Sequence, residues 1–233
     1  MIDWSPPKKP AAYAEKSLIL AILNEDFPPG SILPAERELA TKLGVTRPTL
    51  RETLQRLERD GWVNIQQGKS TRVNDFWKDG GLNVLNALVQ YSEKLPPNFI
   101  PNLLHVRLVL APAYTRQAVE NSPSQVSNYL INYINLTDHH DEYASFDWRL
   151  HYTLTIASGN PIYTLILNGF AGFYEQMARK YLKQVETRNA SRDFYRSLYE
   201  AVIQNDPITA ENITRNMMTE SIKLWESHSG DTP

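Results

Sequence analysis

The stretch that most constrains the fold is residues 34–72, which contains two short helical patterns separated by a glycine. Pro34 suits the first turn of a helix, and Gly44 ends that helix after residue 43. Thr46 is expected to cap a second helix that has a proline in its first turn, where no backbone donor is lost. The apolar side chains of this second helix fall at i, i+4 and i+7 and therefore point inward: Leu50, Leu54 and Leu57.

A strand–turn–strand pattern follows the second helix. Gly61 supplies the left-handed stop of the helix. Val63 and Ile65 alternate with polar residues, which predicts a half-buried strand, and the segment Gln67-Gly68-Lys69 turns the chain back into a second strand. Two helices, a tight turn between them and a terminal hairpin predict a winged helix-turn-helix, a fold that holds duplex DNA.

The charges of this stretch agree with a DNA partner. Between residues 37 and 72, eight Lys/Arg residues face four acids, a local excess of +4 in a chain whose net charge is −2. Arg47 and Arg51 share the outer face of the second helix, where an arginine can pair with a guanine edge. The alternative is a pair of solvated charged helices. The order of helix, turn, helix and hairpin favours DNA binding.

Composition limits the other possibilities. The chain has 233 residues, 42% of them hydrophobic and 21% charged, which is ordinary for a globular protein and enough for two modest domains. It has no cysteine, so neither disulfides nor thiolate metal sites are possible. No apolar run approaches the roughly 20 residues of a transmembrane helix, and no signal segment is evident. We expect a cytoplasmic protein.

The chain is expected to divide into four parts. Residues 1–10 form a flexible arm, residues 11–74 the winged helix-turn-helix domain, residues 75–81 a linker and residues 82–233 an all-α antiparallel bundle. The fold class is therefore mainly α. The expected helices of the bundle cover 82–92, 100–121, 124–135, 139–158, 161–186, 191–204 and 207–227, with breaks at Pro96-Pro97 and three later prolines.

Five segments carry a resemblance to a known family. Two lie near the N-terminus, FPPGSILPAERELATKLGVTRPTLRETLQRLERDGW and NIQQGKSTRVNDFW, and three lie later, NLLHVR, ASGNPIYTLILNG and ESIKLW. The first two resemble the heads of GntR-type bacterial transcription regulators, and the later three are similar to the fatty-acid-responsive members. The resemblance covers nearly the whole chain. It implies a homodimer that binds a palindromic operator and releases it when long-chain acyl-coenzyme A (acyl-CoA) binds, with no other cofactor.

In such regulators, repression of fatty acid degradation genes is expected, and activation of unsaturated fatty acid synthesis genes stays open. The resemblance places operator contacts at Arg37, Thr46, Arg47, Thr49 and Arg51, and it places the wing tip, Gln67-Gly68, in the minor groove. Two residues depart from the pattern. Pro48 replaces a hydroxyl residue and can donate no hydrogen bond to phosphate, and Gln67 replaces a histidine.

The resemblance also implies a ligand pocket in the bundle. The spacings agree, because three pairs of its residues share helix faces at i+3, i+7 or i+4. The implied ligand-binding residues are Leu104, Arg107, Tyr174, Tyr181, Tyr195, Ser221 and Trp225. Without the resemblance, aromatic residues at helical spacing are more often core. Met218 replaces a glycine near the ligand, so the chain-length preference stays open.

Two other functions compete with this interpretation. Asp147 and His151 form an Asp-x3-His pair, which begins a metal site in a sister group that senses small organic acids. The third position is Tyr195 and residues 207–227 contain no histidine, so we expect no metal, although partial binding stays open. An enzyme such as a thioesterase is disfavoured, because no nucleophile elbow or phosphate loop is present.

Overall fold

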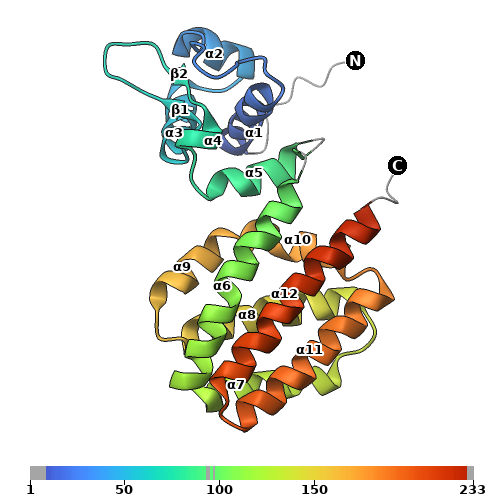
Figure 1. Cartoon of the computed structure of the whole chain (residues 1–233). Coiled ribbons are helices and arrows are strands. Elements are labelled where there is room, and N and C mark those ends of the chain that lie inside the picture. The colour runs from blue at the N-terminus through green and yellow to red at the C-terminus, as the bar shows by residue number, and fades with distance from the viewer. Residues whose placement is uncertain (1–8, 93–94, 97, 230–233) are drawn as a thin grey trace. The chain divides into compact units, whose positions relative to one another are not determined.

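The computed structural model describes residues 9–92, 95–96 and 98–229 and divides into two compact units, Met1–Leu95 and Pro96–Pro233. Helices dominate both units, with a single two-stranded sheet in the first, which confirms the predicted mainly α class (Figure 1). Most of the predicted N-terminal arm lies outside the described residues, and Pro10 already begins the first helix. None of the described helices has the length and apolar character needed to cross a membrane.

The N-terminal unit contains the predicted helix-turn-helix. Its elements are α1 (Pro10–Leu23), α2 (Glu36–Leu43), α3 (Arg47–Arg59), β1 (Val63–Asn64), β2 (Arg72–Val73), α4 (Phe76–Asp79) and α5 (Asn83–Tyr91). Gly44 ends α2 with a φ of +65°, the left-handed conformation that glycine adopts without strain. Thr46 caps α3, because its Oγ1 accepts a hydrogen bond from the Thr49 amide at 3.3 Å.

The wing is anchored on both sides. Val63 of β1 pairs with Val73 of β2, and the segment before α2 joins them through a bridge between Ile32 and Arg72. On the other side, Oε1 of Glu58 in α3 accepts a hydrogen bond from the Ile65 amide at 2.8 Å. The hairpin is therefore fixed to α3, although its tip is exposed.

The segment after the wing packs on the N-terminal unit. The ring of Phe76 in α4 lies 5.0 Å from that of Trp62, and the Gly81 amide donates to the Asp60 carbonyl at 3.2 Å. Helix α5 packs against α1 and buries Val84, Ala87 and Leu88. Residues 75–95 thus belong to the first compact unit. This differs from the predicted linker at 75–81 and bundle start at 82, because the apolar face of α5 is buried against the head.

The second unit is a helical bundle. Its helices are α6 (Phe99–Asn121), α7 (Pro123–Leu130), α8 (His140–Ala157), α9 (Pro161–Gly169), α10 (Ala171–Tyr181), α11 (Val185–Ile203) and α12 (Pro207–Ser229), with a short 3₁₀ helix at Ile131–Asn135. Helix α12 runs beside α6 in the opposite direction, and α8 contacts four helices, α6, α7, α9 and α10 (Figure 1). Helix α8 is therefore the centre of the bundle.

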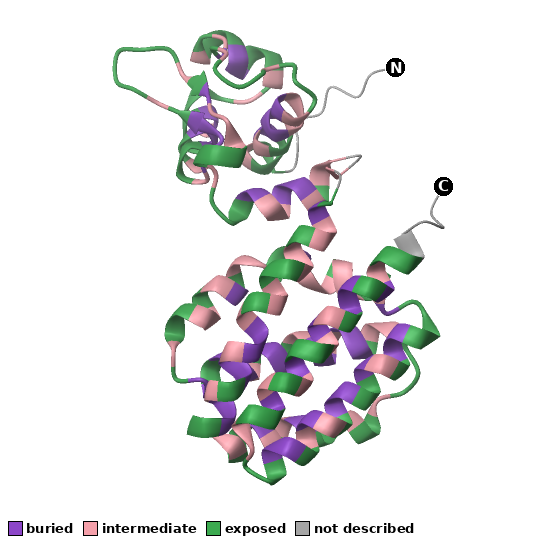
Figure 2. Cartoon of the chain, viewed as in Figure 1, coloured by how far each residue is buried: buried purple, intermediate pink, exposed green. Residues whose placement is uncertain are grey.

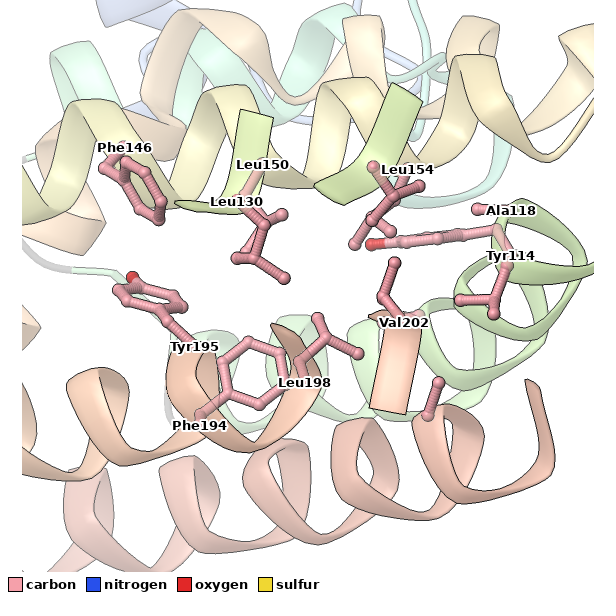
Figure 3. Packing of buried hydrophobic residues seen from close by; sticks show 14 of the residues in the cluster. Tyr114, Ala118, Leu130, Phe146, Leu150, Leu154, Phe194, Tyr195, Leu198 and Val202 are labelled. Atoms are coloured by element: carbon pink, nitrogen blue, oxygen red, sulfur yellow. The ribbon is translucent and has the colours of Figure 1, made fainter. Parts of the chain in front are cut away.

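The core of the bundle forms around α8. Leu150 and Leu154 of α8 face Leu198 and Val202 of α11 across the interior, and the ring of Tyr195 lies 4.8 Å from that of Phe146 (Figure 3). Buried residues of both units lie on the inward faces of the helices, and exposed residues lie outward (Figure 2). This amphipathic arrangement is what the helical periodicity predicts.

Three predicted helices differ in their bounds. The predicted helix 161–186 is two helices that meet at Phe170, where two neighbouring glycines lower helix propensity. The predicted helix 124–135 changes to 3₁₀ geometry after Leu130. The predicted helix 191–204 begins earlier, at Val185, because the buried Thr187 and Arg188 hold its first turn.

Candidate DNA-binding surface and ligand cavity

The predicted DNA-contacting residues lie on one part of the N-terminal unit, around the start of α3. Arg47 and Arg51 are exposed on α3, Arg37 is exposed on α2, and Thr46 is exposed at the cap of α3. Thr49 is half-buried, and its Oγ1 lies 2.9 Å from that of Thr46. The wing residues Gln67 and Gly68 are exposed, and Gly68 turns with a φ of +76°. The side chains that recognition would need are therefore accessible.

Some of the described basic residues of this unit form ion pairs with acidic residues, and others do not. Arg51 pairs with Glu36 through Nε and Oε2 at 2.7 Å, and Arg56 and Arg59 also have acidic partners. Within the described part of the chain, the cations of residues 34–73 that have no acidic partner are Arg37, Arg47, Lys69 and Arg72. The uncompensated charge thus lies on α2, at the start of α3 and on the wing. Phosphate groups attract charge of this kind.

The C-terminal unit contains a cavity of about 130 Å³, mostly apolar, walled by α6, α8, α9, α10 and α12. Six of the seven predicted ligand-binding residues line it: Leu104, Arg107, Tyr174, Tyr181, Ser221 and Trp225. They come from three helices that are far apart in the sequence. The i+3, i+7 and i+4 spacings do place each pair on one helix face.

Arg107 is the centre of a polar cluster on the cavity wall. Its Nη2 donates to Oδ2 of Asp147 at 2.7 Å and to Nε2 of His151 at 2.6 Å. Its guanidinium carbon lies 5.5 Å from the centre of the Tyr174 ring, within the range of a cation–π interaction. The hydroxyl of Tyr174 also donates to Oδ2 of Asp147, at 2.5 Å. Two helices, α6 and α8, are joined by this ion pair.

His151 is neutral in this arrangement. A guanidinium can only donate, so Nε2 of His151 accepts and carries no proton. The proton is on Nδ1, which donates to the Tyr114 hydroxyl at 2.7 Å. Complete burial, with the nearby charge of Arg107, lowers the pKa of His151 to about 3, against a smaller opposite effect of Asp147. The imidazole is therefore uncharged at neutral pH.

Asp147 remains ionised although it is buried. Burial raises the pKa of this carboxyl group, but Arg107 and the hydrogen bonds from Tyr174 and Tyr195 outweigh burial and hold the pKa below its usual value. Tyr195, the seventh predicted ligand-binding residue, does not line the cavity. It is buried behind the wall, where its hydroxyl donates to Oδ1 of Asp147 at 3.1 Å. Its observed role is to hold Asp147.

Two buried polar atoms of cavity-lining residues have no hydrogen-bond partner, Nε of Arg107 and the hydroxyl oxygen of Tyr181. An unsatisfied buried donor costs about 1–3 kcal/mol. A ligand with an acceptor oxygen would recover this free energy. The arrangement therefore suits an apolar molecule with a small number of polar atoms.

Several residues of the site were not predicted from the sequence. Tyr114 lies seven residues after Arg107 on α6, and this spacing on one helix face could have indicated it. Phe170 and Phe173 line the cavity at the break between α9 and α10, which no residue pattern indicated. The resemblance placed Met218 near the ligand, but Met218 is buried in the core. Its neighbour Met217 lines the cavity instead.

The Asp-x3-His pair makes no metal site in the described structure. The lone pair of Nε2 of His151 accepts from Arg107, and both oxygens of Asp147 accept from other side chains. The guanidinium occupies the position between these two residues. Another group of possible ligands, His139, His140 and Asp141, is at the start of α8, partly exposed, and Asp141 pairs with Arg179 at 3.0 Å.

A winged helix-turn-helix unit and a helical unit with an internal cavity are the architecture of a transcription regulator that responds to a ligand. The family model of bacterial regulatory proteins of the gntR family matches residues 10–73, and the FadR C-terminal domain matches residues 74–233. The chain therefore belongs to the GntR family, in the branch with a FadR C-terminal domain. It is a DNA-binding regulator and not an enzyme.

Three relatives are similar to this chain over nearly its whole length. The fatty acid metabolism regulator proteins of Shewanella halifaxensis and Shewanella pealeana are 44% and 43% identical to this chain over 226 residues, which cover 97% of this chain and 95% of each relative. That of Shewanella oneidensis is 42% identical, over 97% of this chain and 94% of the relative. The chain is a transcription regulator of this type.

Solved structures support the fold. Lar, described as controlling expression of the Listeria monocytogenes agr system, has a TM-score of 0.64 over 96% of this chain and 99% of that chain. Its sequence identity is 17%, so the likeness concerns the fold alone.

Proposed function

We propose that the protein is a homodimeric repressor of fatty acid degradation genes, which long-chain acyl-CoA releases from palindromic operator DNA in the bacterial cytoplasm. An activating role at unsaturated fatty acid synthesis genes is part of the same proposal. The observation that carries it is the apolar cavity whose polar groups form one ion pair and leave two buried atoms unpaired. The names of the relatives support the fatty acid connection.

In the N-terminal unit, Arg47 and Arg51 read base edges in the major groove. Arg37, Thr46 and Thr49 contact phosphates and set the position of the helix, and the wing tip, Gln67-Gly68, enters the minor groove. Arg47 has no acidic partner, whereas Arg51 has to exchange Glu36 for a base. Pro48 has neither a hydroxyl group nor an amide proton, so the phosphate contact expected from a hydroxyl residue at this position is missing.

In the C-terminal unit, the acyl chain lies along the apolar walls of the cavity. Its burial is the main source of affinity, at about 0.8 kcal/mol for each methylene group. Arg107, Tyr174 and Tyr181 meet the polar atoms next to the chain, and Ser221 and Trp225 of α12 form the opposite wall. Tyr195 acts through Asp147 rather than by contact.

The protein has one conformation that binds the operator and another that does not. The ligand releases DNA only if its affinity for the second conformation is higher than its affinity for the first. By linkage, the operator weakens ligand binding by the same factor. Variants of the cavity should therefore change release without changing operator affinity in the absence of ligand.

The metal-dependent sensor of a small organic acid is the second candidate. It is less well supported, because Arg107 already donates to both Asp147 and His151. The mostly apolar lining of the cavity also suits a lipid chain better than a small polyanion.

The test is titration of a fluorescent operator duplex, selected from random sequences by binding, with oleoyl-CoA, oleate and citrate. We expect release by oleoyl-CoA at the lowest concentration. Ser221→Asn, which adds volume to the wall, and Trp225→Ala, which removes part of it, should leave operator affinity within about twofold. Both should raise the oleoyl-CoA concentration for release at least tenfold, about 1.4 kcal/mol.

Lys223→Ala is the matched control, because Lys223 is exposed on the same helix and does not line the cavity. Its release curve should match that of the wild type. Metal-dependent release by citrate, with no response to oleoyl-CoA, would support the second candidate instead.

A further inference from the structure

The cavity wall has no net charge. Among the residues that line it, only Arg107 and Asp147 carry a formal charge, and they form an ion pair at 2.7 Å. His151, which also lines the cavity, is neutral because its Nε2 accepts from Arg107 and its Nδ1 donates to Tyr114. One positive charge is cancelled by one negative charge.

The negative charge is firmly held. Asp147 accepts hydrogen bonds from three donors, Nη2 of Arg107 and the hydroxyls of Tyr174 and Tyr195. Tyrosine hydroxyls that donate to a carboxylate stabilise its ionised form. The cluster is therefore arranged to keep Asp147 charged in a buried, mostly apolar setting, although a protonated carboxyl would be easier to bury there.

The groups that remain for a ligand are Nε of Arg107 and the hydroxyl of Tyr181, both buried and unpaired. A carbonyl oxygen of a thioester or amide needs one or two donors and brings no charge. A fatty acid carboxylate or a phosphate brings a negative charge that Arg107 can no longer neutralise, since Asp147 already does so. An uncompensated charge in a buried apolar cavity is strongly disfavoured.

We propose that Asp147 is the positioning residue that makes this cavity select neutral acyl thioesters and exclude fatty acid anions, by cancelling the charge of Arg107. The inference rests on the proposed function and names the chemical group that Arg107 meets, a carbonyl. It also assigns a purpose to the hydroxyls of Tyr174 and Tyr195, which keep the excluding charge in place.

The test compares two ligands that have the same acyl chain and differ in charge at its end. Oleate is the anion, and the oleoyl thioester of N-acetylcysteamine is a neutral thioester without a nucleotide. Calorimetric titration below the micelle concentration should show that the wild-type protein prefers the thioester at least tenfold. Asp147→Asn leaves Arg107 uncompensated, so its affinity for oleate should rise at least tenfold and the preference should reverse.

Asp193→Asn is the matched control. It makes the same substitution at an exposed aspartate of α11 that does not line the cavity, so it should keep the preference of the wild type. A merely structural role of Asp147 would weaken both ligands together and could not produce a gain for oleate. Thermal unfolding and operator binding show whether each variant is folded.

The double variant Arg107→Gln/Asp147→Asn gives a second test, because it removes both charges of the ion pair together. It has no formal charge on the wall, so it should exclude oleate as the wild type does. The inference is wrong if this variant or the wild type binds oleate and the thioester with equal affinity. It is also wrong if Asp147→Asn does not raise the affinity for oleate.

The two proposals fail in different ways. The wild-type protein could bind the thioester and oleoyl-CoA while Asp147→Asn shows no higher affinity for oleate. That result would keep the proposed function and contradict the role of Asp147. A wild-type protein that binds neither oleoyl-CoA nor the thioester overturns both.

Discussion

A single buried imidazole, that of His151, should make this protein sensitive to mild acid. Its pKa is about 3 in the folded state and about 6.5 in the unfolded chain. Between these values the unfolded state binds one more proton, so the free energy of unfolding falls as pH falls, by about 1.4 kcal/mol for each pH unit. Arg107 donates to Nε2 of His151, so this hydrogen bond exists only with the neutral imidazole.

His151→Gln replaces the imidazole by a polar side chain that does not titrate. Urea unfolding of the full chain at pH 7 and pH 5 should show that the wild type loses about 2 kcal/mol more than the variant over this interval. Groups shared by both proteins cancel in the comparison. Equal losses would mean that His151 takes up its proton without unfolding.

The arginines of the N-terminal unit should differ in what they recognise. Arg47→Ala should cost about 1–3 kcal/mol of operator binding and reduce the discrimination between the operator and a scrambled duplex. Arg37→Ala should weaken both duplexes alike and reduce the salt slope of binding by about 1. Fluorescence anisotropy at several salt concentrations measures both effects. An unchanged ratio of operator to scrambled affinity in Arg47→Ala would remove its base-reading role.

At the scale of elements, the turn after α3 depends on Gly61. This residue has a φ of +88°, and a Cβ at this position would lie 2.3 Å from the carbonyl oxygen of Asp79 in α4. Backbone strain and the clash with a backbone atom add, so Gly61→Ala should destabilise the N-terminal unit by about 3 kcal/mol or more.

Gly44→Ala is the control for this prediction. Gly44 is also left-handed, with a φ of +65°, but a Cβ there has open space around it. It should cost about 1–2 kcal/mol from backbone strain alone. The difference between the two variants in thermal unfolding isolates the contact between α4 and the turn.

The helix-turn-helix of the N-terminal unit could be predicted from local signals alone. Thr46, Pro48 and Gly44 act within one or two turns of chain, and each has the role that its residue type favours. The break at Phe170 could not be predicted, because nothing local separates a glycine inside a helix from one between two helices. Helix α5 shows a similar limit: its amphipathic face does not indicate which partner it packs on, and in the structure it packs on α1.

For the cavity, the sequence could indicate which residues share a helix face. It could not indicate which residues of different helices contact each other. Spacing on each helix grouped Tyr174 with Tyr181 and Ser221 with Trp225, and the structure brings these faces to one cavity. The pairing of Arg107 with Asp147 joins residues 40 positions apart and depends on how α6 packs on α8. The same packing puts Tyr195 behind the wall.

At the scale of the whole molecule, we expect two copies of the chain to bind the operator together. One winged head contacts only a few base pairs, so a palindromic operator is matched by a two-fold protein. Trp77 of α4 and Leu82 are exposed apolar residues of the N-terminal unit, with exposed fractions of 55% and 40%. Large apolar side chains on a surface often mark an interface. We therefore expect the dimer contact to include Trp77.

Light scattering at micromolar concentration should give twice the chain mass of 26.7 kDa. Trp77→Glu places a charge at the proposed contact, so it should shift the protein towards monomer and weaken operator binding at least tenfold. Tyr152→Glu makes a similar aromatic-to-acid change at an exposed position of the C-terminal unit and should do neither. A wild-type monomer with or without operator DNA would contradict the two-fold arrangement, whereas a dimeric Trp77→Glu protein would move the contact elsewhere. Because the effector cavity lies in the other unit, Trp77→Glu should leave oleoyl-CoA affinity unchanged, which separates loss of assembly from loss of folding.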